Sequence, residues 1–171
     1  MKKTILFLFG FLSFALSAQT KNVFDIARSG SLDEMKMAFK TNPEVINTVN
    51  DNGSSTLILA CYRANIEVAK FLIDNVKDID YNTGMGTALM GAIFKDQIEL
   101  IKLLLNKKAN VDAQDANGGT ALMLAVQGAN QEIIKLLLER KANKAIKNND
   151  GKTAFEIAVF AGNEAIINLL K

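Results

Sequence analysis

The chain has 171 residues, enough for one ordinary domain, and its 49% hydrophobic and 22% charged residues exclude a disordered chain. It contains no histidine, which excludes Ser-His-Asp and Cys-His catalytic systems, histidine-ligated zinc or haem, and an imidazole pH switch. A single cysteine excludes an internal disulfide framework and a multi-cysteine metal site, and we expect no cofactor.

The N-terminus has the pattern of a secretory signal peptide. Lys2 and Lys3 precede an apolar run over residues 5–16, and the small residues Ser17 and Ala18 follow it. Cleavage after Ser17 or after Ala18 would leave a mature domain over residues 19–171, in the periplasm of a bacterium or outside the cell. The alternative is an uncleaved anchor, but the uncharged stretch of 17 residues is at the lower limit of a membrane span.

Removal of the signal peptide changes the charge of the chain. The full sequence has 20 basic and 18 acidic residues, and Lys2 and Lys3 leave with the signal, so the mature chain has 18 of each and a net charge of zero. A neutral chain without a basic stripe gains little affinity from releasing the counterions of a nucleic acid. We therefore expect no nucleic-acid partner and no stable membrane insertion after cleavage.

The rest of the chain repeats. Thr87, Thr120 and Thr153 are 33 residues apart, and Ser55 lies 32 residues before Thr87. An alanine follows each of these four residues at a fixed distance, then Asn or Gln, and then an apolar run rich in Leu and Ile. The alanines are Ala60, Ala92, Ala125 and Ala158, and the polar residues are Asn65, Gln97, Asn130 and Asn163.

Each repeat unit predicts two helices. The Ser or Thr at the start is a good N-cap for a first helix of about nine residues, whose small alanine permits close approach of its neighbours. The second helix begins after the Asn or Gln and carries the bulky apolar face, with acidic residues in its first turn and basic residues at its end, as the helix dipole favours. Gly53, Gly118 and Gly151 mark the turns between units and are expected at positive φ.

This pattern resembles the ankyrin repeat, a unit of about 33 residues with a β-turn, two helices and a T-P-L-H-x-A signature. The signature appears as TALMGA over 87–92, TALMLA over 120–125 and TAFEIA over 153–158, and more weakly as STLILA over 55–60; the family's Pro and His are absent from all four. The resemblance implies an all-α, right-handed solenoid of helix-turn-helix repeats joined by β-turn loops. The five units expected are 22–50, 51–82, 83–114, 115–147 and 148–171.

Motifs that could carry chemistry fail when their spacing is checked. The stretch 78–84 is similar to a calcium loop, but its glycine comes one residue late and Leu89 occupies the place of the bidentate glutamate. The end of a phosphate-binding loop at 151–153 lacks its first glycine, because Ile146 is there. Cys61 follows an alanine of the repeat register and is expected to be a small buried residue. We expect neither a metal site nor a catalytic site.

The ankyrin resemblance implies a protein-protein interaction module. With the signal peptide, it predicts an exported scaffold, chaperone-like partner or inhibitor of another envelope or secreted protein. The alternative is a histidine-free enzyme or a toxin-immunity protein that uses acidic residues.

The same resemblance places the partner along the concave side, against the first helices and the turn tips. The residues that vary there between repeats form what we call the variable stripe: Tyr62, Arg63, Phe94, Lys95, Gln127 and Phe160. The turn tips beside it are Asp51, Asn52, Ala116 and Asn117. Aromatic and basic residues of this kind dominate interface hot spots and suit a partner with an apolar patch rimmed by acidic groups. The alternative is that the aromatic rings pack between the helices.

Overall fold

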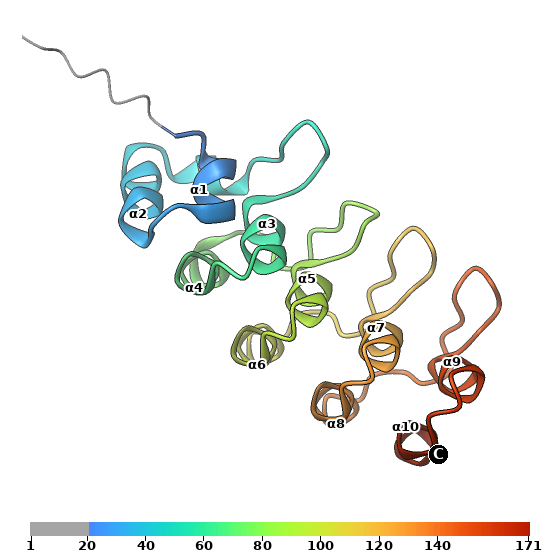
Figure 1. Ribbon diagram of the computed structural model, residues 1–171. Coiled ribbons are helices and arrows are strands. Elements are labelled where there is room, and N and C mark those ends of the chain that lie inside the picture. The colour runs from blue at the N-terminus through green and yellow to red at the C-terminus, as the bar shows by residue number, and fades with distance from the viewer. Residues whose placement is uncertain (1–20) are drawn as a thin grey trace, which may run out of the picture.

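The computed structural model describes residues 21–171, and the predicted signal peptide 1–18 lies outside the described residues. The described chain is a stack of antiparallel helix pairs, with the loops between pairs projecting to one side (Figure 1). The elements are α1 Val23–Ser29, α2 Leu32–Thr41, the short 3-10 helix η1 Pro43–Asn47, α3 Thr56–Tyr62, α4 Ile66–Asn75, α5 Ala88–Phe94, α6 Ile98–Asn106, α7 Ala121–Gln127, α8 Gln131–Glu139, α9 Ala154–Phe160 and α10 Glu164–Leu170. Within 21–171 there is no strand beyond two isolated bridges, so the prediction of a helical solenoid is confirmed.

The first helices begin where the sequence predicts. The hydroxyl oxygens of Ser55, Thr87, Thr120 and Thr153 each accept a hydrogen bond from the backbone N–H three residues on, at 3.2 to 3.4 Å. These helices have seven residues, so the expected length of about nine is wrong. They end early because the second residue after each helix takes a left-handed conformation: Ala64, Asp96, Ala129 and Gly162.

The second helices begin after the polar residue of the repeat register, and in two repeats that residue also bonds the preceding repeat. The side chain of Asn65 donates to the carbonyl oxygens of Ile26, Ala27 and Gly30, at 3.2, 3.3 and 2.9 Å, which satisfies the free end of α1. The side chain of Asn130 donates to Asp96 Oδ1 at 2.9 Å. These contacts fix α3 and α4 on the first helix pair, and α7 and α8 on the pair of α5 and α6.

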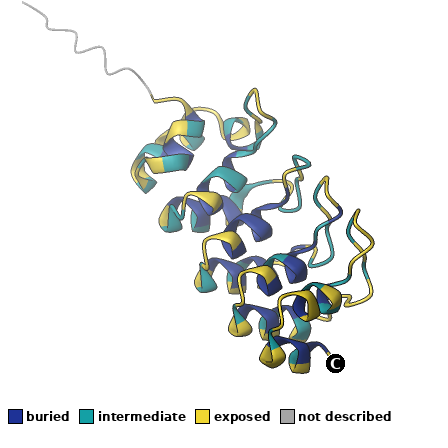
Figure 2. Cartoon of the chain, turned by 45° about the vertical axis from the view of Figure 1, so that its right-hand side comes forward, coloured by how far each residue is buried: buried dark blue, intermediate teal, exposed yellow. Residues whose placement is uncertain are grey.

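The core runs without interruption through the stack between the two layers of helices (Figure 2). The alanines of the first helices are buried, and so are the central leucines of the second helices, Leu72, Leu104 and Leu137. Each repeat therefore packs on its neighbours rather than around a single centre, as expected of a solenoid. None of the helices described is long and apolar enough to cross a membrane.

The loops project from the first-helix layer, and their tips are exposed (Figure 2). Gly53, Gly118 and Gly151 have φ of 74°, 71° and 74°, as predicted, and close three similar turns. At the base of the loops, a backbone N–H of each repeat donates to a side-chain oxygen of the repeat before: Lys77 to Asn47, Asn110 to Asp80 and Asn143 to Asp112. The bases of all successive loops are thus held together.

Candidate functional site

Two aromatic rings of the variable stripe stack on one another at the ends of neighbouring first helices. The rings of Tyr62 in α3 and Phe94 in α5 have centroids 5.2 Å apart and an interplanar angle of 15°. The two residues remain 44% and 58% exposed, so they do not pack between the helices. The ammonium nitrogen of Lys95 is 5.3 Å from both ring centroids, within the range of a cation–π interaction. The stack is a preformed, exposed apolar surface with a positive charge on it.

The close approach of α5 to α3 explains the stack. Tyr62 and Phe94 occupy the same position in successive repeats, and Gly91 lies one turn before Phe94. A Cβ at Gly91 would be 3.3 Å from the backbone nitrogen of Tyr62 and 3.6 Å from the Cβ of Cys61. The absence of a side chain at Gly91 therefore lets the two helices come close enough for their terminal rings to stack.

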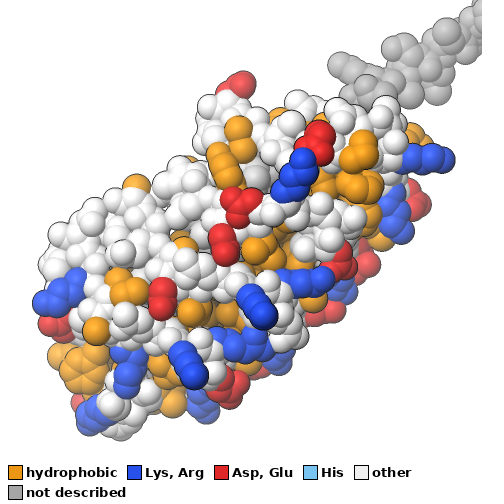
Figure 3. All heavy atoms as spheres, turned by 180° about the vertical axis from the view of Figure 1, so that it is seen from behind, with side chains coloured by type: hydrophobic (Ala, Val, Ile, Leu, Met, Phe, Trp, Pro, Cys, Tyr) orange, Lys and Arg blue, Asp and Glu red, His pale blue; other side chains and the backbone are white. Residues whose placement is uncertain are grey.

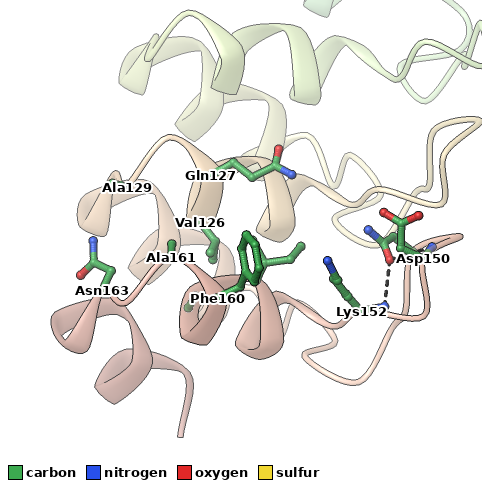
Figure 4. Close-up of a pocket in the computed structure, with 11 residues that line it drawn as sticks. Val126, Gln127, Ala129, Asp150, Lys152, Phe160, Ala161 and Asn163 are labelled. Atoms are coloured by element: carbon green, nitrogen blue, oxygen red, sulfur yellow. Dashed lines mark hydrogen bonds between the residues drawn. The ribbon is translucent and has the colours of Figure 1, made fainter.

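The third ring of the stripe lies in a separate hollow near the C-terminal end. Phe160 is 85% exposed, and the ammonium of Lys152 lies 4.9 Å from its ring centroid. Figure 4 shows the ring and Lys152 directed toward one another, with Gln127 across from them on α7. This hollow, which we call the end groove, has a volume of about 550 Å³.

A larger hollow lies beside the Tyr62–Phe94 stack, and we call it the central groove. It has a volume of about 680 Å³ and is bordered by Tyr62, Arg63 and Phe94, with the loop residues Asn52 and Met85. The structure thus brings together the first half of the variable stripe and one of the predicted turn tips.

The other predicted turn tips lie elsewhere. Asp51 borders a third, smaller hollow near α1. Ala116 and Asn117 are exposed on the next loop and border neither the central groove nor the end groove. Their backbone atoms bind the flanking loops instead: Ala116 N–H donates to Gly84 O at 2.6 Å, and Asn117 O accepts from Asn149 N–H at 2.9 Å.

Three basic residues of the first-helix side, Arg63, Lys95 and Lys152, have no carboxylate partner in the described chain. Within residues 21–171, no Asp or Glu oxygen lies within 4.0 Å of the charged nitrogens of Arg63, Lys95 or Lys152. Charges of both signs are interspersed on the face that Figure 3 shows, with hydrophobic side chains reaching the surface between them. These three cations are therefore available to an acidic group from outside.

Cys61 and the acidic loop offer no chemistry of their own. Burial in the first-helix layer raises the pKa of the Cys61 thiol to about 12, so it stays protonated and unreactive. In the stretch similar to a calcium loop, Asp78 accepts from the backbone of Asp80, and Asp80 accepts from that of Asn110 at 2.7 Å. Within 21–171, no group of three or more His, Cys, Asp or Glu residues could hold a metal ion.

Sequence reasoning missed Met85 and Gly91. Met85 is an apolar residue on a loop, 85% exposed, and it occupies a position at which the other repeats have glycine. Gly91 occupies a position at which the other repeats have a large aliphatic residue: Leu59, Leu124 and Ile157. Aligning the repeats position by position would have revealed both.

The stacked helix pairs with their projecting loops define a helical repeat protein with an exposed side for binding. A family model described as ankyrin repeats (3 copies) matches residues 23–115 and 89–171. The chain belongs to the ankyrin repeat family. It is therefore a protein-protein interaction module of a family that is generally non-enzymatic.

Two curated relatives carry the same family name. The chain is similar to "Ankyrin repeat and SAM domain-containing protein 6" of Mus musculus and of Rattus norvegicus, each 28% identical over 99 residues. The matched segment is 57% of this chain but 11% of each relative, so the similarity concerns a small part of those longer proteins.

Proposed function

We propose that this chain is an exported ankyrin module that holds another envelope or secreted protein on its first-helix side, as a scaffold, chaperone-like partner or inhibitor. One observation carries the proposal: the exposed stack of Tyr62 and Phe94 with Lys95 over both rings. Aromatic and basic residues that a fold leaves exposed and preorganised are the residues that dominate binding hot spots.

The chemistry of this side favours a partner with an apolar patch rimmed by acidic groups. The rings offer apolar area, and Arg63 and Lys95 offer charge that no carboxylate of residues 21–171 neutralises. Oppositely charged rims speed association and select against wrong partners.

The test is capture of the partner followed by binding measurements with purified components. The mature chain, residues 19–171, is used to capture proteins from an envelope extract, and the captured protein is purified and titrated with variants. Tyr62→Ala and Phe94→Ala should weaken binding strongly and leave the fold intact. Met37→Ala is the control, because Met37 is 70% exposed but lies on α2. A partner that binds both aromatic variants as tightly as the wild type would contradict the proposal.

Export is tested independently of binding. The basic start and apolar run of residues 2–16 support cleavage after Ser17 or Ala18. Intact-mass measurement of the protein from its native cell should give a chain that begins at Ala18 or Gln19. A mass that includes residues 1–17 would contradict export by cleavage.

A further inference from the structure

Three departures from the repeat pattern meet at the central groove. Ser55 and Thr87 are 32 residues apart whereas the later threonines are 33 apart, so the chain has one residue fewer between these first two N-caps. The loop that follows carries Met85 in place of glycine, and α5 carries Gly91 in place of a large aliphatic residue. Met85 and Gly91 both border the central groove.

The shorter spacing between Ser55 and Thr87 goes with the absence, in residues 21–171, of a hydrogen bond between the loop tips that precede them. At two junctions the tips are joined by backbone: Ala116 N–H donates to Gly84 O, and Asn149 N–H donates to Asn117 O. The equivalent bond at the preceding junction would join Thr83 N–H to Asn52 O. Within the described chain, no hydrogen bond joins the tip residues 48–54 to residues 80–86, although the bases of the same loops are joined by Lys77 and Asn47. Thr83 N–H and Asn52 O therefore have no bond to one another at the mouth of the groove.

The glycine at position 91 places bare backbone in the floor of the groove. In the first-helix layer, Leu59 and Leu124 lie on either side of Gly91 in the repeat register, and both border the groove. Gly91 itself borders the groove, so bare backbone forms part of the floor between two aliphatic side chains. A volume of about 680 Å³ is ample for a large side chain.

The third departure adds an apolar wall. Met85 is 85% exposed and borders the groove together with Tyr62 and Phe94. A flexible thioether beside two aromatic rings suits an inserted side chain of any apolar shape.

The charge available at the groove is positive. Arg63 borders it, and Lys95 lies over the aromatic stack. Arg28, at the other end, is already paired with Asp25 at 2.9 Å. The bordering carboxylate of Asp115 accepts hydrogen bonds at Oδ1 from the backbone N–H groups of Asn117 and Gly119, at 2.8 and 2.7 Å, which anchor it to its own loop.

We propose that the central groove binds an extended segment of the protein partner. The segment inserts one large apolar side chain into the hollow over Gly91 and presents a neighbouring carboxylate to Arg63 and Lys95. Its backbone forms hydrogen bonds with Asn52 O and Thr83 N–H, the two groups that are not bonded to one another between the loop tips. This inference rests on the proposed function and names the part of the partner that is recognised.

Selection from a phage-displayed library of short random peptides tests this recognition directly, with the mature chain as bait. The selected peptides should be enriched in Asp or Glu next to a large apolar residue. In methyl NMR spectra, the strongest binder should shift Leu59, Leu124 and Met85. Met85→Ala and Arg63→Gln should each lower the affinity for that peptide by about tenfold. The controls Met37→Ala and Lys36→Gln, on exposed positions of α2, should not.

Several results would overturn the inference. These are the absence of acidic enrichment, methyl shifts confined to the end groove, or peptide affinity unchanged in Met85→Ala. Sedimentation that shows a dimer of the chain, broken by Met85→Ala, would assign the groove to a second copy and equally overturn it.

The captured natural partner separates this inference from the proposed function. If Tyr62→Ala lowers the affinity for the partner but Met85→Ala does not, the proposed function is upheld and the groove assignment is overturned. If selected peptides bind the groove although Tyr62→Ala and Phe94→Ala leave the binding of every captured envelope protein unchanged, the groove assignment is upheld and the proposed function is overturned. A partner weakened by Met85→Ala as well as by Tyr62→Ala supports both.

Discussion

The lysines of the two helix layers are held in different ways. Three lysines of the second-helix layer pair with carboxylates of a neighbouring repeat: Lys70 with Glu99 at 2.8 Å, Lys102 with Glu132 at 3.4 Å and Lys107 with Asp74 at 2.8 Å. On the first-helix side, Lys95 and Lys152 lie over aromatic rings and have no carboxylate partner in the described chain.

This difference distinguishes the second-helix side, where ion pairs join neighbouring repeats, from the first-helix side, which we propose for the partner. Three ion pairs of the second-helix layer connect one repeat to the next, and the charges in them are already partnered. Hydrogen bonds from the ammonium of Lys70 to Glu99 and Glu67 also raise the pKa of Lys70. On the first-helix side, the rings of Tyr62, Phe94 and Phe160 remain exposed. Lys95 and Lys152 lie over these rings but pair with no carboxylate of the described chain.

The largest expected effect concerns the core that both layers share. Leu104 and Leu137 are fully buried in the second helices of central repeats. Leu104→Ala or Leu137→Ala should reduce the free energy of unfolding by about 2–5 kcal/mol, because each leaves a cavity between repeats. Urea denaturation of the purified mature chain measures this loss. A cost under about 1 kcal/mol at both positions would mean that these leucines do not hold the interfaces.

The next effect sharpens the contrast between stability and binding. Tyr62→Ala and Phe94→Ala should each cost about 2 kcal/mol in binding to the captured partner, since both rings are exposed hot-spot candidates. The melting temperature should stay nearly unchanged. Calorimetric titration and thermal denaturation of the same samples give both quantities. A lower melting temperature with binding intact would instead make the rings part of the packing.

A smaller loss is expected at a helix N-cap. The hydroxyl of Thr120 accepts from Met123 N–H at the buried start of α7. Thr120→Ala should reduce stability by about 1 kcal/mol, and Thr120→Ser, which retains the oxygen, should lose less. Equal losses in the two variants would show that the methyl group of Thr120, rather than its oxygen, carries the effect.

The capping box of α9 predicts a pH dependence. The backbone N–H and the hydroxyl of Thr153 donate to Glu156, at 2.6 and 2.8 Å, and lower the pKa of that carboxyl from its ordinary value of 4.5. The stability that this carboxylate contributes is present above the unfolded pKa and is lost as pH falls through the lower folded pKa. Glu156→Gln should therefore flatten the acid limb of stability against pH, measured by urea denaturation.

Glu139→Gln is the matched control for the capping box, because Glu139 is exposed and accepts no hydrogen bond in residues 21–171. The acid limb of this control should match that of the wild type. An acid limb unchanged in Glu156→Gln would contradict the role of the capping box.

The smallest effect belongs to the exposed ion pairs. A double-mutant cycle of Lys70→Gln and Glu99→Gln should give a coupling of about 0.2–0.5 kcal/mol that declines in high salt, because both side chains are partly exposed. A coupling above about 1.5 kcal/mol would show that these pairs stabilise the stack far more than exposed pairs do.

The sequence predicts much of the fold because every repeat must present the same faces to its neighbours. The hydroxyl N-caps, the buried alanines and the positive-φ glycines recur at fixed spacing, so each can be recognised by its register. The length of the first helices was overestimated because the left-handed residues that end them include Ala64 and Asp96, which do not mark a turn by their type.

The geometry of the candidate site could be predicted only in part. The register places Tyr62 and Phe94 at equivalent positions, but their stacking depends on how closely α5 approaches α3 at Gly91. The central groove depends on Met85 and on a missing hydrogen bond between loop tips, and both are exceptions to the repeat. A repeat pattern predicts what successive units share and gives no geometry for the places where they differ.

The central claim is that a partner binds the first-helix and loop side rather than the second helices. Amide hydrogen exchange of the mature chain, with and without its purified partner, measures this directly. The account predicts added protection over residues 51–63 and 83–95, with α4 and α6 unchanged. Protection confined to α4 and α6, with the loops and the Tyr62–Phe94 stack exchanging as in the free chain, would contradict it.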